Sequence, residues 1–286
     1  MISNDNNTYI LNTGKRKLVL GERTLIMGIL NVTPDSFSDG GRFLSTDDAI
    51  AEGISMAKDG ADILDIGGES SRPGSEAVPA DEEMKRVIPV IRSLAERVRI
   101  PISIDTTKAL VAGEAIANGA EIVNDISALM FDRGMPEVIA KTGAAVILMH
   151  MRGTPKDMQE GDLIYHSLPG DIISFLKERI KVAELAGIDP LAIMIDPGFG
   201  FGKTPEDNLK LLKHLSYFTE LKKPIVTGVS RKSFIGKITG GEPFERIEGT
   251  AAALTVTVMN GTHIARVHDV KAMKKVAAMA DAIIRV

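Results

Sequence analysis

Eight short apolar runs, each followed by a polar residue, constrain more than any other feature how this chain of 286 residues can fold. They lie at 25–30, 62–66, 101–104, 121–123, 144–149, 192–195, 224–229 and 263–267. The segments between them, such as 46–61 and 170–187, show helical periodicity. Strands that alternate with helices predict a parallel sheet, and eight such units at this length favour a closed barrel over an open sheet. The predicted fold class is α/β, a (β/α)8 TIM barrel, with an open doubly wound sheet as the alternative.

The length of the chain fits either two average domains or one barrel. No linker, low-complexity tract or internal repeat divides it, so we expect a single domain over residues 1–286. Residues 1–16 are predicted to be a polar N-terminal extension. The segment 17–26, KLVLGERTLI, alternates around a glycine and predicts a β-hairpin ahead of the first barrel strand.

Charge and residue usage exclude several classes of protein. The net charge of −4, the absence of Trp and the presence of only three Tyr argue against nucleic-acid binding. Without cysteine there are no disulfides and no thiolate metal sites. No uncharged apolar run reaches the about 18 residues of a membrane span, and the start, MISNDNNTYI, is too polar for a secretory signal. We expect a cytoplasmic protein whose partner is a small molecule.

Polar residues follow every one of the apolar runs. In a (β/α)8 barrel the active site is built from the loops after the strands, so these residues are the candidates. They are Asn31, Asp35, Glu69, Ser71, Arg72, Asp105, Asn124, Asp125, His150, Asp196, Ser230, Arg231, Lys232, Arg266 and His268. Capping or rim salt bridges would account for a few such residues, but not for eight strand ends out of eight.

Two groups of these residues suggest two chemistries. Asp105, Asn124, Asp196 and Lys232 offer two carboxylates, an amide and a cation, which match a flat heterocycle with alternating donors and acceptors. Arg72, Arg266 and His268 are basic and suit phosphate oxygens, while Asn31 offers a neutral oxygen ligand to a Mg²⁺ held mainly by phosphate and water.

The stretch 196–204, DPGFGFGKT, ends like a nucleotide-binding phosphate loop. Such a loop needs a glycine separated by four residues from the Gly-Lys pair, and Pro197 stands there without an N–H. We therefore interpret the stretch as a strand that presents Asp196 above a glycine-rich loop, or as a plain strand and turn.

Several long segments in register make the chain resemble a known family, dihydropteroate synthase. They are GILNVTPDSFSDGG, DILDIGGESSRPGS, PISIDT, EIVNDIS, LMHMRGTPKDMQ, IDPGFGFGKT, GVSRKSFIG and ARVHDV, and the resemblance runs from residue 18 to the C-terminus. It implies a transferase that joins para-aminobenzoate to 6-hydroxymethyl-7,8-dihydropterin pyrophosphate, with Mg²⁺ as cofactor, a homodimeric assembly and inhibition by sulfonamides.

The resemblance also assigns roles to individual residues. Pterin binding falls on Asp105, Asn124, Asp196 and Lys232, and pyrophosphate and Mg²⁺ on Asn31, Arg72, Arg266 and His268, with Asn31 as the metal ligand. Aminobenzoate binding falls on Ser71, Pro73, Phe201, Gly228, Ser230 and Lys232. Asp105, Asp196, Lys232, Arg266 and His268 are the implied catalytic residues, and Asp35, Ser36 and Phe37 lie in a loop expected to close over the substrate.

The chain departs from the family pattern at two positions, and two other functions are possible alternatives. Ser71 stands where Thr is usual and Ala128 where Gly is common. A pterin-dependent methyltransferase would share the pterin-binding residues but would not need the basic group, so Arg72, Arg266 and His268 favour the synthase. A catalytically silent pterin-binding barrel would be expected to lack some of the charged loop residues.

Overall fold

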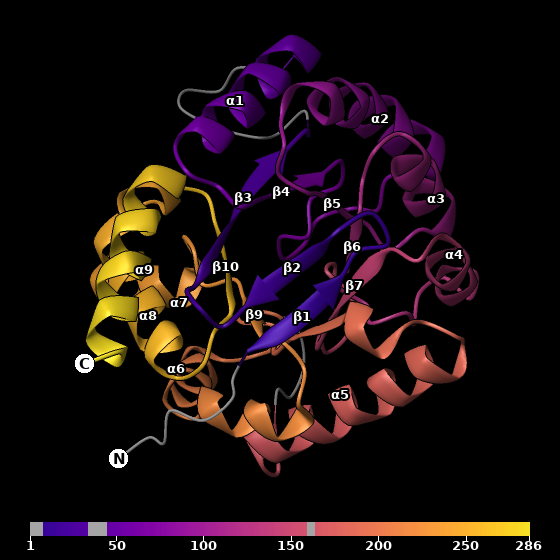
Figure 1. Cartoon of the computed structure of the whole chain (residues 1–286). Helices are drawn as coiled ribbons and strands as arrows, with labels where there is room; N and C mark the ends of the chain where they lie inside the picture. Colours follow the sequence, from indigo (N-terminus) through magenta and orange to yellow (C-terminus); the bar gives the residue numbers. More distant parts are fainter. Residues whose placement is uncertain (1–7, 34–44, 159–163) are drawn as a thin grey trace.

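The computed structural model describes residues 8–33, 45–158 and 164–286 and confirms the predicted barrel. Eight parallel strands form one sheet in the order β8-β7-β6-β5-β4-β3-β10-β9. They are β3 (Leu25–Asn31), β4 (Ile63–Gly67), β5 (Ile102–Asp105), β6 (Ile122–Asp125), β7 (Ala145–Met149), β8 (Ile193–Asp196), β9 (Val226–Thr227) and β10 (Ile264–Val267). Figure 1 looks into the ring of strands, with the helices arranged around it.

The sheet closes between its first and last strands through a thin connection. A single parallel bridge joins Ile195 of β8 to Ile225, and the Ile195 amide donates to the Pro224 carbonyl at 3.0 Å. β9 itself has only two residues, although the apolar run there extends over 224–229. The barrel is therefore complete, with its fewest inter-strand hydrogen bonds at this seam.

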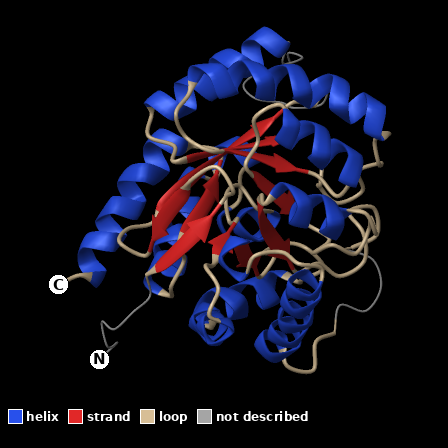
Figure 2. Ribbon diagram, turned by 45° about the vertical axis from the view of Figure 1, so that its right-hand side comes forward, coloured by secondary structure: helices blue, strands red, loops and turns tan. Residues whose placement is uncertain are grey.

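Helices cover the outside of the barrel, as the red strands inside blue helices show in Figure 2. They are α1 (Thr46–Lys58), α2 (Ala80–Arg97), α3 (Ala109–Ala117), α4 (Met135–Thr142), α5 (Leu168–Leu185), α6 (Pro205–Lys213), α7 (Ser233–Thr239), α8 (Ile247–Met259) and α9 (Val270–Ile284), with short 3-10 turns η1 (Pro190–Ala192), η2 (Leu215–Leu221) and η3 (Pro243–Glu245). Capping boxes on Ser45 and Thr204 start α1 and α6, because each side chain satisfies an otherwise free amide of the first turn.

The N-terminal hairpin exists, but the prediction of its strands was wrong. β2 (Lys17–Leu20) pairs antiparallel with β1 (Tyr9–Asn12), within the predicted extension, and residues from Leu25 onward belong to the barrel. Burial explains the difference, since Leu11 and Leu20 are both fully buried. The Thr13 hydroxyl donates to Glu121, just before β6, so the hairpin covers the N-terminal end of the barrel, as Figure 1 shows.

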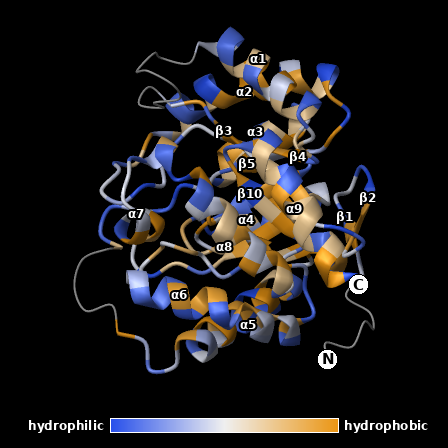
Figure 3. Ribbon diagram, turned by 90° about the vertical axis from the view of Figure 1, so that its left-hand side faces the viewer, coloured by the Kyte–Doolittle hydropathy of each residue, from blue (hydrophilic) through white to orange (hydrophobic). Residues whose placement is uncertain are grey.

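Apolar side chains from the strands and the inner sides of the helices form one large core. Figure 3 shows hydrophobic residues along the strands and mixed colouring along helices such as α6 and α9, which face solvent on one side. Among the described residues, no helix is long and apolar enough to cross a membrane.

Candidate active site

Strand register brings several of the predicted residues to one level of the barrel. Asn31 pairs with Gly67, Gly67 with Asp105, and Asp105 with Asn124, so four neighbouring strands contribute to one rung. A Cβ on Gly67 would lie 3.6 Å from the Asp105 Cβ and 3.7 Å from Asn31 Oδ1. Both polar side chains therefore flank the open space above this glycine. Asp196, at the end of β8, pairs with Met149.

An ion-pair network that centres on Arg266 lies below this rung. Its Nε donates to Asp65 Oδ2 at 2.6 Å and its Nη2 to Asp105 Oδ2 at 2.7 Å. Asn124 Nδ2 also donates to Asp65 Oδ2, at 3.1 Å. The other oxygen of Asp65, Oδ1, is buried and has no hydrogen-bond partner among the described residues. Arg266, predicted with the pyrophosphate group, is thus held between the carboxylates of Asp65 and Asp105, the second of which was predicted to bind the pterin.

Asp65 is a residue that the sequence analysis missed. It is fully buried inside β4 and was interpreted as part of an apolar strand run. A signal was present, because it lies two residues before Gly67 and therefore faces the same way, into the barrel. An ionisable residue on the inner face of a barrel strand needs a partner, and Arg266 provides it.

The pKa values of the central ionisable groups are shifted towards neutral pH. Burial raises the pKa of Asp105 to about 7, against the opposing charge of Arg266, and the Asp65 carboxylate raises it further. Burial likewise raises the pKa of Asp196 to about 6, although the Gly198 amide, 2.7 Å from Oδ1, lowers it. Burial lowers the pKa of Lys232 to about 8, helped by Arg266. Substrate binding at such a site shifts protons as well as charges.

Phe201 and Lys232 lie together, as the resemblance implies for the aminobenzoate side. The Lys232 ammonium lies 4.2 Å from the centre of the Phe201 ring, within cation–π distance. The loop that carries Phe201 has left-handed backbone at Gly198, Gly200 and Gly202, where glycine avoids steric strain.

Ser230 and His268 are joined by hydrogen bonds. His268 Nδ1 lies 3.0 Å from Ser230 Oγ, and the His268 amide donates to the same oxygen at 3.2 Å. Burial, followed by the charges of Arg231 and Arg266, holds the pKa of His268 well below its usual value. The structure therefore groups Ser230, predicted on the aminobenzoate side, with His268. Gly228 lies beside Arg266, since a Cβ there would be 4.0 Å from the arginine Cβ and Cδ.

The loop after β4 places Ser71, Arg72 and Pro73 at the rim. Arg72 and Pro73 are exposed, and Ser71 is half-buried. The Gly74 amide donates to the Pro155 carbonyl at 2.9 Å, which ties this loop to the one after β7. Glu69 accepts from the Val78 amide and from Lys108, each at 2.7 Å. Asp35, Ser36 and Phe37 lie outside the described residues.

An apolar cluster that the sequence analysis also missed borders the polar groups. Ile126, Met149, Met151, Met158 and Phe201 pack together and are each at most 7% exposed. Flat, polarisable ligands favour contact with such thioether and aromatic surfaces. Only the methionines that flank His150 in the sequence hinted at this cluster.

Two of the strand-end candidates do not face the barrel mouth. His150 is buried against Phe175 of α5, edge to face at 5.0 Å, and its Nδ1 lies 3.0 Å from Lys203 Nζ. Asp125 accepts hydrogen bonds from the amides of Ser127 and Leu129 at 2.8 and 2.9 Å. These bonds shape a turn in which Ala128 takes a φ of 51°, a conformation that suits the glycine common in the family.

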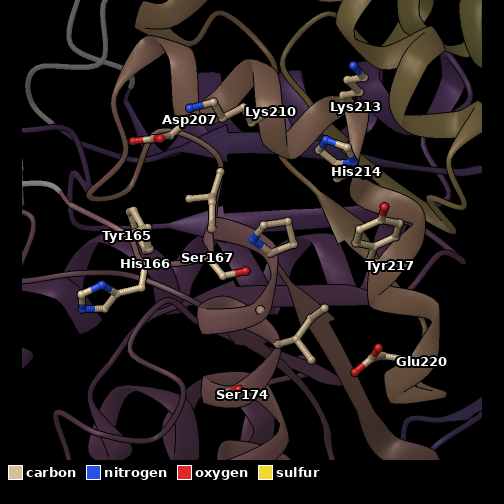
Figure 4. A pocket seen from close by; sticks show the side chains of 14 residues that line it. Tyr165, His166, Ser167, Ser174, Asp207, Lys210, Lys213, His214, Tyr217 and Glu220 are labelled. Carbon is tan, nitrogen blue, oxygen red and sulfur yellow. The ribbon is translucent and has the colours of Figure 1, made fainter.

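A cavity of about 830 Å³ lies away from these residues, between the start of α5, α6 and η2 (Figure 4). Its lining includes Tyr165, Ser167, Lys210, His214 and Tyr217, and none of the predicted site residues. It is a separate hollow on the flank of the barrel. Within the described ranges, no group of three or more His, Asp or Glu side chains is arranged to hold a metal ion.

Comparison with known proteins gives consistent matches over almost the whole chain. A family model described as pterin binding enzyme matches residues 27–268. A dihydropteroate synthase of Bacillus subtilis is 46% identical over 277 residues, covering 97% of this chain and 94% of the relative. The structure of Xanthomonas albilineans dihydropteroate synthase with 4-aminobenzoic acid superposes with a TM-score of 0.90 at 44% identity, covering 98% of this chain and 100% of that chain. The Yersinia pestis enzyme with a sulfonamide drug complex also gives a TM-score of 0.90, at 42% identity, covering 94% and 98% of the two chains.

Proposed function

The chain belongs to the family of pterin-binding enzymes, and from this we infer that it catalyses the dihydropteroate synthase reaction. It joins para-aminobenzoate to 6-hydroxymethyl-7,8-dihydropterin pyrophosphate and releases pyrophosphate and 7,8-dihydropteroate. The observation that carries the proposal is the position of Lys232. Its ammonium lies against Phe201 and also interacts with the charges of Asp196 and Asp105, so one residue links the sites of both substrates.

Pterin binding is assigned to Asp105, Asn124, Asp196 and Lys232. The carboxylates accept hydrogen bonds from the amino and ring N–H groups, and the ammonium and amide donate to the carbonyl and ring nitrogen. The methionines of the apolar cluster cover the flat face of the ring.

The leaving pyrophosphate meets the basic residues Arg72, Arg266 and His268. Arg266 uses two donor nitrogens, Nε and Nη2, on the carboxylates of Asp65 and Asp105. A guanidinium has five N–H donors, so it retains donors for a phosphate oxygen without breaking these ion pairs. Arg72, exposed at the rim, is assigned to the outer phosphate.

The donor set also fits a Mg²⁺ ion that takes most of its ligands from phosphate and water. Asn31 faces the mouth with a neutral oxygen beside Asp105, and no preformed acidic cluster lies among the described residues. When bound, Mg²⁺ would supply positive charge that stabilises the leaving group.

The bond between the exocyclic methylene and the pyrophosphate oxygen breaks early, and the aniline nitrogen then attacks the methylene carbon. The pterin ring delocalises the positive charge that develops on the methylene, and the carboxylates of Asp105 and Asp196 stabilise it. The electron pair of the broken bond leaves with pyrophosphate. The attacking nitrogen then loses one proton, and because an aniline is weakly basic this step needs no strong general base.

Aminobenzoate is assigned to the side of the mouth formed by Ser71, Pro73, Phe201, Gly228, Ser230 and Lys232. The Phe201 ring offers a face to the benzene ring of para-aminobenzoate. Sulfonamides resemble para-aminobenzoate in having an aryl amine and a polar end. The Yersinia pestis structure contains such a drug complex, and we assign the same inhibitor class to this chain.

The alternative function is pterin-dependent methyl transfer. It would use the same pterin groups and leave the cluster of Arg72, Arg266 and His268 without a ligand. The silent-barrel reading is disfavoured because every charged residue of the predicted set in the described ranges is present and most converge on the mouth.

A homodimer and a cytoplasmic location complete the proposal. Apolar side chains exposed on the late elements support the first: Ile238 of α7, Phe244 of η3, and Val256 and Met259 of α8. Sedimentation equilibrium should give twice the mass of 30.7 kDa. Fractionation of cells that produce the protein tests the location.

The decisive experiment follows pyrophosphate release from the pterin pyrophosphate with Mg²⁺, with and without para-aminobenzoate, and measures dihydropteroate directly. Aminobenzoate-dependent release, matched by dihydropteroate, is the expected result. Asp196→Asn should abolish it, whereas Lys210→Met, on the exposed side of α6, should not. Pterin binding without condensation would refute the proposal.

A further inference from the structure

We propose that Lys203, to which no role is assigned above, is a positioning residue that fixes the Phe201 loop and thereby the aminobenzoate site. This inference rests on the proposed function. Lys203 lies in the stretch that ends like a phosphate loop, yet it is only 2% exposed. Its position is the first indication that it acts from beneath the loop.

The contacts of Lys203 connect both ends of the turn that carries Phe201. Its Nζ donates to the Gly198 carbonyl at 2.8 Å and to the Phe201 carbonyl at 3.1 Å. Its third neighbour is His150 Nδ1, at 3.0 Å. An ammonium has three N–H donors, so these three acceptors use all of them.

His150 completes this anchor as a neutral ring. Burial and the charge of Lys203 lower the pKa of His150 to about 2, so the ring is neutral. Because an ammonium can only donate, Nδ1 is the acceptor of this pair. The ring is held edge to face against Phe175 and packs near Tyr165. Burial lowers the pKa of Lys203 itself to about 7, although the charge of Asp196 opposes this, so the anchor has its full set of three donors below that pH.

The loop depends on such an anchor for its carbonyl groups, because its other backbone restraints hold amides. The Gly198 amide donates to Asp196 and the Gly200 amide to Asn208, each at 2.7 Å, and the Phe201 amide donates to the Gly198 carbonyl at 3.2 Å. Three of its residues are glycines, the least restricted residues in a protein, and each has left-handed backbone. The Tyr165 hydroxyl adds one bond, to the Gly202 carbonyl at 2.8 Å. Without the ammonium, the Phe201 carbonyl would lose its hydrogen-bond partner and the Gly198 carbonyl would keep only the Phe201 amide, so the loop would shift to expose them. Phe201 would then leave its place 4.2 Å from the Lys232 ammonium.

The test compares Lys203→Met with wild type, and with Lys210→Met as the matched loss of an exposed lysine. In Lys203→Met we expect the KM for para-aminobenzoate to rise between about tenfold and a hundredfold, as expected for a misplaced binding group. The dissociation constant for the pterin pyrophosphate, measured by calorimetry, should change less than about threefold, because Asp105 and Asn124 lie on other strands and Asp196 is held in β8, ahead of the loop. Equal losses for both substrates, or an unchanged KM, would overturn the inference.

A second readout does not depend on activity. Hydrogen exchange of the backbone amides in 197–204, followed by mass spectrometry, should be faster in Lys203→Met than in wild type and unchanged in Lys210→Met. If wild type lacks aminobenzoate-dependent turnover, the proposed function fails, while this exchange still decides the anchoring role. If Lys203→Met does not fold, His150→Leu removes one acceptor and should show the same changes more weakly; unchanged exchange in 197–204 there would refute the anchor.

Discussion

Replacing Asp65 gives the sharpest test of the central ion-pair network. Asp65→Asn keeps the volume and one oxygen acceptor, which can still receive Arg266 Nε and Asn124 Nδ2, so mainly the charge is lost. A hydrogen bond to a charged group contributes about 1.5–3 kcal/mol and a neutral one about 0.5–1.5 kcal/mol. The expected loss in the free energy of unfolding is therefore about 1–2 kcal/mol. Asp65→Ala removes the acceptor as well and should cost about 3–5 kcal/mol, as for a broken buried ion pair.

The measurement is urea unfolding of four proteins: wild type, Asp65→Asn, Arg266→Met and the double variant. Because the two side chains touch at 2.6 Å, the cycle should give a coupling energy well above the about 0.5 kcal/mol expected for independent sites. Asp81→Asn, exposed on α2, is the control and should change stability by less than about 0.5 kcal/mol. Additive effects of Asp65→Asn and Arg266→Met would show that the pair does not interact as described.

The same variant has a kinetic signature. The Asp65 carboxylate raises the pKa of Asp105, so removing its charge should lower that pKa. The acid limb of kcat/KM against pH, which reports the free enzyme, should then move to lower pH. A limb that stays in place would mean that Asp65 and Asp105 are not electrostatically coupled.

Three further predictions concern the pH dependence, the loop and the rim. The pKa of Asp105, about 7, predicts that kcat/KM falls as pH drops below that value, and the pKa of Lys232, about 8, that it falls again above that value, giving a bell. Because the pKa of Asp105 is raised in the folded state, the contribution of this group to stability is complete below its unfolded pKa and is lost as pH rises towards about 7. The free energy of unfolding of Asp105→Asn should therefore rise relative to that of wild type as pH increases between these two values. Gly198→Ala places a Cβ 1.9 Å from the His150 carbonyl oxygen at a φ of 74°, so we expect the free energy of thermal unfolding to fall by more than about 2 kcal/mol. The control Gly113→Ala, in α3, should not lower it, because the added Cβ meets only Val138 Cγ1, at 3.7 Å, and the backbone is helical. Arg72→Met should raise the KM for the pterin pyrophosphate about tenfold or more, while calorimetric affinity for the pterin without phosphates stays constant.

Much of the fold and of the site followed from the positions where the apolar runs end. Parallel strands in a barrel bring their C-terminal ends to one edge. Asp105 and Asn124 are apart in the sequence but each ends a strand, so they were expected to meet at that edge. The strand register confirms that they are paired. The same rule placed Arg266 at the mouth. That rule could not show that Arg266 donates two hydrogen bonds to carboxylates, because these bonds depend on the directions of the side chains on β4 and β5.

Three features could not be predicted from the sequence pattern, each for a physical reason. Asp65 is hidden in an apolar run, where one charged residue hardly changes the periodicity. The burial of Lys203 depends on the path of a glycine-rich loop, and glycine permits many paths. The hairpin was misplaced because the alternation of 17–26 does not show that Tyr9–Asn12 is its partner; that choice depends on Leu11 and Leu20, which are buried against the barrel end.

The seam between β8 and β9 gives the barrel wall an uneven stiffness. The rung that contains Asn31, Asp105 and Asn124 lies on strands joined by uninterrupted ladders, whereas a single bridge at Ile195 and Ile225 closes the opposite side. The cylinder will therefore deform most easily along that line. Gly228, assigned to the aminobenzoate pocket, borders the compliant wall, as do Asp196 and Lys232, whereas Asp105 and Asn124 lie on the rigid one. Elastic adjustment to a second substrate can then take place while Asp105 and Asn124 keep their positions.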